Sequence, residues 1–387
     1  MNFFCRQRIK SYLVVLSFLL LTIASIGQEY SYTHYDSKDG LAGSTVYCVT
    51  QDREGFLWFG TENGLSRFDG THFKNFTTAD GLPDNEILRV FVDSRDRIWI
   101  LPFRNSVCYY SKGKIYNQQN DSSLKKLVLT GNVRSVLEDK AGNILIQENF
   151  YSHLIKPDGR IIRMVIGDNG YGIADAGINR NGNFRIAFYD PNHMVFADFD
   201  DKSSHLFSRG NSSTIHNSVF LITPGVDVFS KDNYFYFFPA DSGQFTFPIP
   251  ENMINVARLN DSLITLNASS KTMIFNWKQR RIVHEFLPGY KVTSVLEDSE
   301  KNLWFTTLGE GIFRLGSTEF RNLRFADKES SLAVFSISKF NSKICIGTDH
   351  SLVWSFDPQE NRLRKYSIDQ GLEDSRITCF ITNTQND

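Results

Sequence analysis

The sequence lacks the residue patterns that mark most catalytic and metal centres. Its 387 residues include five cysteines and eight histidines, with no Cys-x-x-Cys pair for a metal or redox site and no two histidines spaced for joint metal binding. A Gly-x-Ser-x-Gly motif, a phosphate-binding loop and paired catalytic carboxylates are also missing. Residues 198–201 are rich in aspartate, but without an alternating carboxylate loop they predict a solvated turn, not a calcium site. We therefore expect no catalytic residues, no metal and no cofactor in the residues present.

The chain also lacks an excess of charge of either sign. Its 42 basic residues balance 43 acidic ones, for a net charge of −1. This balance offers no basic surface for nucleic acid and no acidic tail, so nucleic acid is not expected as a partner. Long amphipathic helical patterns are missing after residue 29, which argues against a helical domain.

The apolar run at residues 13–26 is too short to span a membrane, which takes about 20 residues. Basic residues precede it, and small residues precede Gln28. This pattern is typical of a secretory signal peptide, which we predict over residues 1–27, with an uncleaved anchor as the alternative. We therefore expect an exported protein whose mature domain is extracytoplasmic.

What the chain does contain is one short pattern that recurs, an aspartate followed six residues later by a large apolar residue. The pairs are Asp52 and Trp58, Asp93 and Trp99, Asp139 and Leu145, and Asp298 and Trp304. A short apolar run precedes each pair, and these runs begin 41, 46 and 159 residues apart. A repeat of about 40 residues built of strands and turns is typical of a β-propeller blade.

The interval of 159 residues indicates how many blades lie between the third and fourth of these pairs. It equals four steps of about 40 residues, so it should contain three degenerate blades, near residues 172–199, 218–247 and 254–286. We therefore predict an all-β fold, a seven-bladed β-propeller of four-stranded blades over residues 28–323.

The repeated residues have a structural interpretation. Each tryptophan, Trp58, Trp99 and Trp304, is bulky enough to pack between neighbouring blades, which we prefer to ligand stacking. In a tight turn, an aspartate side chain can accept a hydrogen bond from the backbone N–H two residues later in the chain. A catalytic residue is normally needed once and not in every blade, so we expect the turn aspartates Asp52, Asp93, Asp139 and Asp298 to be structural as well.

The two ends of this region predict how the ring closes and where a second ring begins. Residues 32–35 form an outer strand without a blade, which should complete the seventh blade and remove an exposed sheet edge. Residues 319–323 would then open a second propeller. Residues 333–356 match the pattern of an eighth blade, and residues 371–380 match the start of a ninth. We predict the first blades of a second, incomplete propeller over residues 324–387, in the N-terminal part of a longer protein, with a truncated gene product as the alternative.

The cysteines of the predicted mature chain lie inside apolar strand runs. They are Cys48, Cys108, Cys345 and Cys379. We interpret them as buried free thiols that pack as small hydrophobic residues. Disulfides are the alternative, because an exported chain with an even number of cysteines permits them.

Residues 55–70 resemble the two-component regulator propeller repeat, and residues 39–41 and 78–85 resemble its blade connectors. The resemblance is strong for the first, second and seventh repeats and the start of the ninth, moderate for the third and eighth, and poor for the fourth to sixth. It implies the periplasmic sensor part of a sensor histidine kinase of Bacteroidetes-type bacteria. Such proteins usually have two seven-bladed rings, a β-sandwich, a transmembrane helix and a cytoplasmic kinase.

The resemblance also implies a function. It implies an extracytoplasmic ligand-sensing propeller of a two-component signal transduction system, tethered to the inner membrane and dimerising through later parts of the full-length protein. The ligand is unknown, and an oligosaccharide is one candidate. We expect no enzyme activity from the residues present, since kinase motifs are missing. The alternatives are a secreted propeller enzyme acting on polysaccharide and a protein-binding scaffold. Binding residues are not predicted, because loops carry no spacing rule.

Overall fold

The computed structural model is built almost entirely of β-strands, in two units that are considered separately. It describes residues 29–165, 173–189, 193–199, 204–211, 220–231, 233–316, 321–322, 333–349, 351–357, 362–367 and 375–380. One unit spans Tyr32–Ser317, and the other joins Thr318–Asp387 with Met1–Ser31. The predicted signal peptide, residues 1–27, lies outside the described residues. Within the described part of the chain, no helix is long and apolar enough to cross a membrane.

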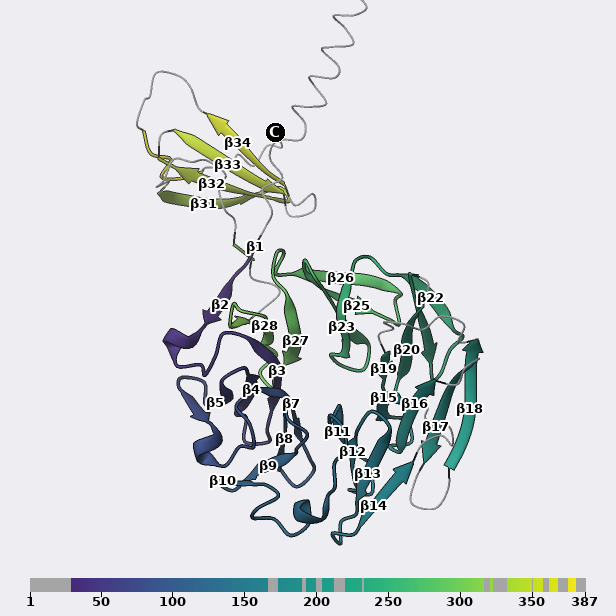
Figure 1. The fold of residues 1–387 in the computed structure, drawn as a ribbon. Coiled ribbons are helices and arrows are strands. Elements are labelled where there is room, and N and C mark those ends of the chain that lie inside the picture. The colour runs from purple at the N-terminus through teal and green to yellow at the C-terminus, as the bar shows by residue number, and fades with distance from the viewer. Residues whose placement is uncertain are drawn as a thin grey trace, which may run out of the picture. The chain divides into compact units, whose positions relative to one another are not determined.

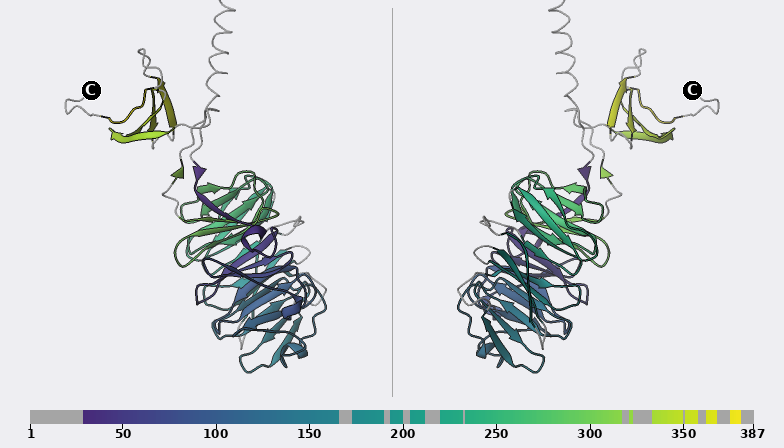
Figure 2. Two further views of the ribbon diagram at one scale, coloured as in Figure 1. Left: turned by 90° about the vertical axis from the view of Figure 1, so that its left-hand side faces the viewer. Right: turned by 90° about the vertical axis from the view of Figure 1, so that its right-hand side faces the viewer.

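The larger unit is a ring of seven four-stranded antiparallel sheets (Figure 1), viewed from two sides in Figure 2. Blades one to three comprise β3 (Val46–Gln51), β4 (Leu57–Thr61), β5 (Gly64–Phe68) and β6 (Phe73–Phe76); β7 (Ile87–Val92), β8 (Ile98–Pro102), β9 (Cys108–Ser111) and β10 (Lys114–Tyr116); and β11 (Ser135–Glu138), β12 (Ile144–Gln147), β13 (Tyr151–Ile155) and β14 (Ile161–Val165). Each of these three sheets is a meander in which consecutive strands pair. The predicted propeller fold is confirmed.

The long interval between recognisable repeats holds three blades, as predicted. Blades four to six comprise β15 (Ile173–Ile178), β16 (Phe184–Tyr189), β17 (His193–Phe199) and β18 (Ser204–Asn211); β19 (Phe220–Ile222), β20 (Val226–Lys231), β21 (Tyr234–Pro239) and β22 (Phe245–Pro248); and β23 (Met253–Arg258), β24 (Leu263–Ala268), β25 (Thr272–Asn276) and β26 (Arg281–Phe286). The predicted end of blade four at residue 199 is wrong, because the range left out the outer strand β18, which pairs with β17.

The ring closes as predicted, through the outer strand at residues 32–35. Blade seven contains β27 (Val292–Glu297), β28 (Leu303–Thr307) and β29 (Ile312–Leu315), and β2 (Tyr32–Tyr35) is its outer strand, paired antiparallel with β29. In Figure 1 this purple strand lies beside the green strands of blade seven. The ring of Tyr35 stacks on that of Trp304 with centroids 5.9 Å apart. The Thr293 hydroxyl donates to the Val46 carbonyl over 2.5 Å and joins blade seven to blade one.

Short 3-10 turns form two of the blade connectors. They are η1 (Ser37–Asp39) and η2 (Thr78–Asp80), and the described residues also include η3 (Leu124–Lys126). A side chain caps the start of each connector turn, and Gly40 and Gly81 follow with φ of 100° and 106°. Glycine suits these positions because side chains rarely tolerate that conformation. The connectors therefore turn sharply from one blade into the next.

The core lies between blades, and each repeated tryptophan packs against the next blade. Trp58 of blade one clusters with Ile87, Ile98 and Ile100 of blade two. Trp99 packs in the same way onto blade three, and Trp304 of blade seven packs onto blade one. Burial of large side chains on both faces of each sheet makes the ring cohesive.

The smaller unit contains one four-stranded sheet and part of a further repeat. Its strands are β31 (Val334–Phe340), β32 (Lys343–Thr348), β33 (Leu352–Asp357) and β34 (Arg362–Ser367), with a short pair of β1 (Glu29–Tyr30) and β30 (Arg321–Asn322). The sheet occupies the residues of the predicted eighth blade. Residues 375–380 lie against it, since Ile377 N–H donates to the Thr348 carbonyl over 3.1 Å. Of residues 319–323, predicted to open a second propeller, only β30 is described.

The described cysteines are free thiols, but one of them is not buried. Cys108 is buried, Cys48 and Cys345 are partly buried, and Cys379 is exposed. Burial raises the pKa of Cys48 to about 11 and also raises that of Cys108. The expectation of a buried thiol is wrong for Cys379, which is exposed among the described residues and lies outside their assigned strands.

Candidate functional site

The repeated aspartates and tryptophans form a bonded pair in three blades. Trp58 Nε1 donates to Asp52 Oδ2 over 2.7 Å. Trp99 donates to Asp93 over 2.8 Å, and Trp304 donates to Asp298 over 2.7 Å. The second carboxylate oxygen of each aspartate accepts a backbone N–H from its own turn. One carboxylate therefore fixes both the turn and the tryptophan that packs between blades.

Blade three keeps the turn without the tryptophan. Leu145 is buried at the tryptophan position. Asn143 Nδ2 instead donates to Asp139 Oδ2 over 2.6 Å. Every turn aspartate of the repeat is thus an acceptor with both oxygens in use.

Blade four breaks this pattern at both positions. Asn179 stands where blades one, two, three and seven have aspartate, and Arg185, six residues on, stands at the tryptophan position. Asn179 Oδ1 still accepts the backbone N–H groups of Asn181 and Asn183, over 2.9 and 3.1 Å, so the turn keeps its shape. The side chain after it is a cation instead of a large apolar ring.

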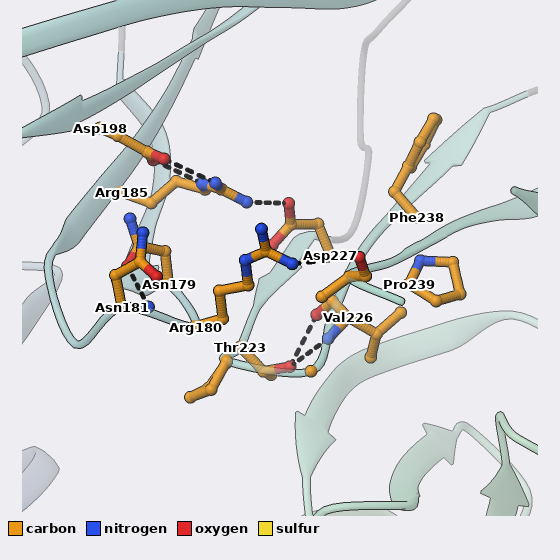
Figure 3. A pocket seen from close by; sticks show the side chains of 13 residues that line it. Asn179, Arg180, Asn181, Arg185, Asp198, Thr223, Val226, Asp227, Phe238 and Pro239 are labelled. Atoms are coloured by element: carbon orange, nitrogen blue, oxygen red, sulfur yellow. Dashed lines mark hydrogen bonds and ion pairs between the residues drawn. The ribbon is translucent and has the colours of Figure 1, made fainter. Parts of the chain in front are cut away.

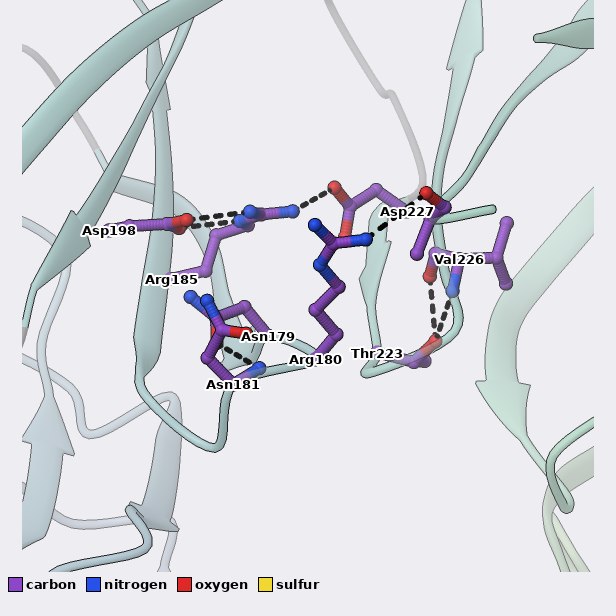
Figure 4. A network of polar contacts seen from close by, with 9 residues as sticks. Asn179, Arg180, Asn181, Arg185, Asp198, Thr223, Val226 and Asp227 are labelled. Atoms are coloured by element: carbon purple, nitrogen blue, oxygen red, sulfur yellow. Dashed lines mark hydrogen bonds and ion pairs between the residues drawn. The ribbon is translucent and has the colours of Figure 1, made fainter. Parts of the chain in front are cut away.

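Arg185 links blade four to blade five (Figure 4). Its Nε and Nη2 donate to the two oxygens of Asp198 on β17, each over 2.6 Å. Its Nη1 donates to Asp227 Oδ2 on β20 over 2.5 Å. Bidentate charge-assisted bonds of this kind are strong and directional. The polar network occupies the interblade position that a tryptophan fills in blades one, two and seven.

A cleft of about 280 Å³ lies beside this network, between blades four and five (Figure 3). Its walls are the turn Asn179–Asn181 of blade four and, from blade five, the turn Thr223–Asp227 and the hairpin Phe238–Ala240. The Thr223 hydroxyl fixes its own turn by bonding both the carbonyl and the N–H of Val226. The cleft exists here because the two blades meet through polar side chains and a short turn.

The electrostatics of the cleft are balanced. Burial by itself would lower the pKa of Arg185, but bonding to Asp198 and the nearby charge of Asp227 outweigh it and raise that pKa. The Arg185 guanidinium is therefore charged and its charge is matched by two carboxylates. Arg180 adds a second cation, with 62 % of its side chain exposed.

Two groups in the cleft have bonding capacity to spare. Asn179 is only 2 % exposed, yet its two bonds both use Oδ1, which leaves Nδ2 without an acceptor among the described residues. Arg180 is held loosely, since its Nη1 lies 3.4 Å from the Ala240 carbonyl and 3.6 Å from Asp241 Oδ1. The cleft can therefore offer hydrogen-bond donors to a ligand.

The inner strands of the ring carry a second group of charges. Asp175 on β15 lies within electrostatic reach of Arg89 on β7 and Arg134 beside β11. Burial raises the pKa of Asp175 to about 6, and the Ala176 N–H and the two arginines offset this only in part. Across the described ranges, no three His, Cys, Asp or Glu side chains gather as metal ligands would.

Sequence reasoning placed a degenerate blade near residues 172–199 but did not identify this cleft or the partners of Arg185. Asp198 was expected in a solvated turn, yet it lies in β17 and binds Arg185. That interpretation was wrong because the alternating pattern of the strand was not recognised; residues 200 and 201 lie outside the described residues. The signal that could have revealed this site is the arginine at the tryptophan position, which the sequence reasoning did not use.

The repeat is recognised by comparison with known proteins. A family model described as "Two component regulator propeller" matches residues 40–63 and 287–309, in blades one and seven. Histidine kinase P4 of Formosa agariphila is 36% identical over 61 residues, which are 16% of this chain and 4% of that protein. The chain therefore spans a small part of that relative.

Solved structures share the fold. The extracellular domain of a hybrid two component system from B. thetaiotaomicron has a TM-score of 0.64 at 18% identity, over 89% of this chain and 50% of that one. A catalytically inactive virginiamycin B lyase from Staphylococcus aureus, solved with quinupristin, has a TM-score of 0.55 at 14% identity, over 74% of this chain and 99% of that one. At these identities the likeness establishes the propeller and nothing more.

Proposed function

We propose that this chain, which carries two-component regulator propeller repeats, is the extracytoplasmic ligand-sensing part of a two-component signal transduction system. The observation that carries the proposal is the match of the repeat family to blades one and seven. The short similarity to a histidine kinase supports the same context. A fold shared with the extracellular domain of a hybrid two component system is consistent with it.

The cleft between blades four and five is the proposed sensing site. Ring-shaped scaffolds hold their binding groups on loops and turns between rigid strands. Here a guanidinium bridges two blades beside a cleft with unused donors. An extracellular ligand, for which an oligosaccharide is the leading candidate, would bind there and favour one of two arrangements of a dimer.

The location and partners of the protein belong to the same proposal. The chain would be exported to the periplasm and tethered to the inner membrane in the full-length protein. A homodimer would form through later parts of that protein. The residues present would bind without catalysing a reaction.

Binding and signalling can be tested together. The purified chain from Gln28 to Asp387 is titrated by calorimetry with a panel of oligosaccharides, and each mixture is then analysed by chromatography for cleavage. In the native host, the transcriptional response to each binder is compared between the wild type and a strain without this gene. We expect binding without cleavage and a response that depends on the gene.

Two results would overturn the proposal. Degradation of a polysaccharide by the purified chain would make it a propeller enzyme. An unchanged transcriptional response in the deletion strain to a sugar that the chain binds would make it a secreted binding protein or a scaffold.

A further inference from the structure

We propose that the cleft between blades four and five recognises an oxyanion group of its ligand, a carboxylate or a sulfate, through Asn179 Nδ2 and the guanidinium of Arg180. The inference concerns the ligand class of the cleft, and it rests on that cleft being the sensing site of the proposed function. It depends on which polar atoms of the cleft are already in use and which are free.

The orientation of the Asn179 amide is fixed by its neighbours. Both groups that approach its Oδ1, the backbone N–H groups of Asn181 and Asn183, are donors. Only the oxygen of an amide can accept them. The remaining atom is therefore the NH₂ group, and in Figure 3 the amide nitrogens of this turn lie on the side that faces Arg185.

This single substitution reverses the polarity of the position. The equivalent atom of Asp52, Asp93 and Asp298 is a carboxylate oxygen that accepts an indole N–H. In blade four the same place presents a donor, and the indole that would have covered it is replaced by Arg185. No described residue accepts a hydrogen bond from this nitrogen, and a ligand oxygen could do so.

The cations of the cleft differ in how much bonding capacity they keep. Arg185 is committed to Asp198 and Asp227 by three bonds of 2.5–2.6 Å. Arg180 makes two longer contacts, of 3.4 and 3.6 Å, and Asp241 on one of them is 95% exposed. A guanidinium with free N–H groups binds planar oxyanions through paired bonds. Arg180 is thus the group that can reach toward a ligand.

The placement of charge leaves one cation of the cleft for an anion. Asp198 and Asp227 share Arg185, whereas Arg180 lies 3.6 Å from Asp241, whose side chain is 95 % exposed and is therefore screened by solvent. The Asn179 amide nitrogen and the Arg180 guanidinium both offer donors, and an oxyanion can accept from both of them. Charge-assisted bonds of this type are about twice as strong as neutral ones.

The size of the cleft limits what enters it. At about 30 Å³ of liquid volume per water molecule, its 280 Å³ holds roughly nine waters. That space suits one acidic sugar unit and not a long segment of a polymer. A chain-end or branch residue such as a uronate or a sulfated sugar has the right chemistry and size.

The test compares matched small probes by isothermal titration calorimetry on the chain from Gln28 to Asp387. The probes are glucuronate, glucose 6-sulfate, glucose, and sodium sulfate alone. We expect glucuronate or glucose 6-sulfate to bind at least about tenfold more tightly than glucose, and the pair shows whether the group is a carboxylate or a sulfate. Equal binding of all three sugars would overturn the proposal. Affinity for sulfate alone that matches the acidic sugars would reduce the site to an adventitious ion only.

Two variants test the named atoms. Asn179→Asp keeps the turn, as Asp139 does in blade three, but replaces the donor with a carboxylate, so it should lower affinity for the acidic probe at least about tenfold with an unchanged melting temperature. Arg180→Gln should have a similar effect. Arg53→Gln is the control, because Arg53 follows the turn aspartate of blade one at the equivalent position, away from the cleft. Full binding by Asn179→Asp or by Arg180→Gln would contradict the assignment.

The outcomes separate this inference from the sensory function. A neutral oligosaccharide that binds the chain and triggers a gene-dependent response would sustain the sensor and overturn the oxyanion site. The converse result is binding of an acidic probe that requires Asn179 and Arg180, while deletion of the gene leaves the transcriptional response unchanged. That result would sustain the oxyanion site and overturn the sensory function.

Discussion

Trp58 and Asp52 are joined by a 2.7 Å hydrogen bond from the indole Nε1 to Oδ2, across the turn between the first two strands of blade one. The same carboxylate accepts the Phe56 N–H. The indole is 1 % exposed and packs onto blade two. One bond thus connects the geometry of a local turn to the packing between blades. In blade four both of its partners are replaced, by Asn179 and Arg185.

Two substitutions at Trp58 should separate packing from hydrogen bonding. Trp58→Ala should lower the free energy of unfolding by about 3–5 kcal/mol, because it leaves a cavity between blades. Trp58→Phe keeps most of the packing but leaves Asp52 Oδ2 without its donor, and should cost about 1–3 kcal/mol. Urea denaturation followed by fluorescence or circular dichroism measures both. A Trp58→Ala protein of wild-type stability that loses ligand binding would mean that the indole serves the ligand instead.

Removing the closing strand should weaken the whole ring. A chain that begins at Lys38 lacks β2, so β29 becomes an open edge, and the stack of Tyr35 on Trp304 is lost. We expect a sharp fall in melting temperature by calorimetry. A chain that begins at Ser31 keeps β2 and is the control. Equal melting temperatures for the two truncated chains would contradict closure by this strand.

Asp175 should make stability fall as the pH rises. Burial raises the pKa of Asp175 from its ordinary value of 3.8 to about 6 in the folded protein. Its stabilising contribution as the neutral acid is therefore complete below about pH 4 and is lost as the pH rises through about 6. Asp175→Asn should gain about 1–3 kcal/mol relative to wild type between pH 4 and pH 7. Denaturant titrations at several pH values measure the difference.

Asp69 serves as a control for the denaturant titrations, because its carboxyl pKa is lowered whereas that of Asp175 is raised. It is exposed, and N–H groups of His72 and Thr71 lower the pKa of its carboxyl to about 2. The ionised form is the one favoured in the folded protein, so any stabilisation is present above about pH 4 and fades as the pH falls toward 2. Asp69→Asn should therefore change the pH profile in the acid range only. A wild-type profile identical to that of Asp175→Asn between pH 4 and pH 7 would refute the burial of Asp175.

The thiols should differ in reactivity by their burial. Cys379 is exposed, while burial raises the pKa of Cys48 to about 11 and raises that of Cys108. Since the thiolate is the reactive form, Ellman's reagent at pH 8 should modify Cys379 quickly in the folded chain and the two others only after denaturation. Cys379→Ser should remove the fast phase. Fast modification of Cys108 in the native chain would contradict its place in the core.

Much of the architecture was predictable because each blade repeats a local pattern. The spacing of Asp52, Asp93 and Asp298 counted the blades even across the region where tryptophan is lost, since every blade needs about the same chain length to form four strands. The outer strand at Tyr32–Tyr35 identified its own partner, because a strand without a blade leaves one free edge to fill. The prediction of where blade four ends failed, because no comparable turn signal in the sequence marks β18.

One part of the candidate site can be read from the sequence, and the other part only from the tertiary structure. The sequence by itself determined that the turn at Asn179 departs from the repeat, and that an arginine stands where a tryptophan is expected. It did not determine the partners of that arginine, because Asp227 is 42 residues away and belongs to another blade. Only the tertiary structure decided this contact: turn and strand patterns are set by neighbouring residues, whereas the side chains that meet between blades depend on how two separate sheets pack.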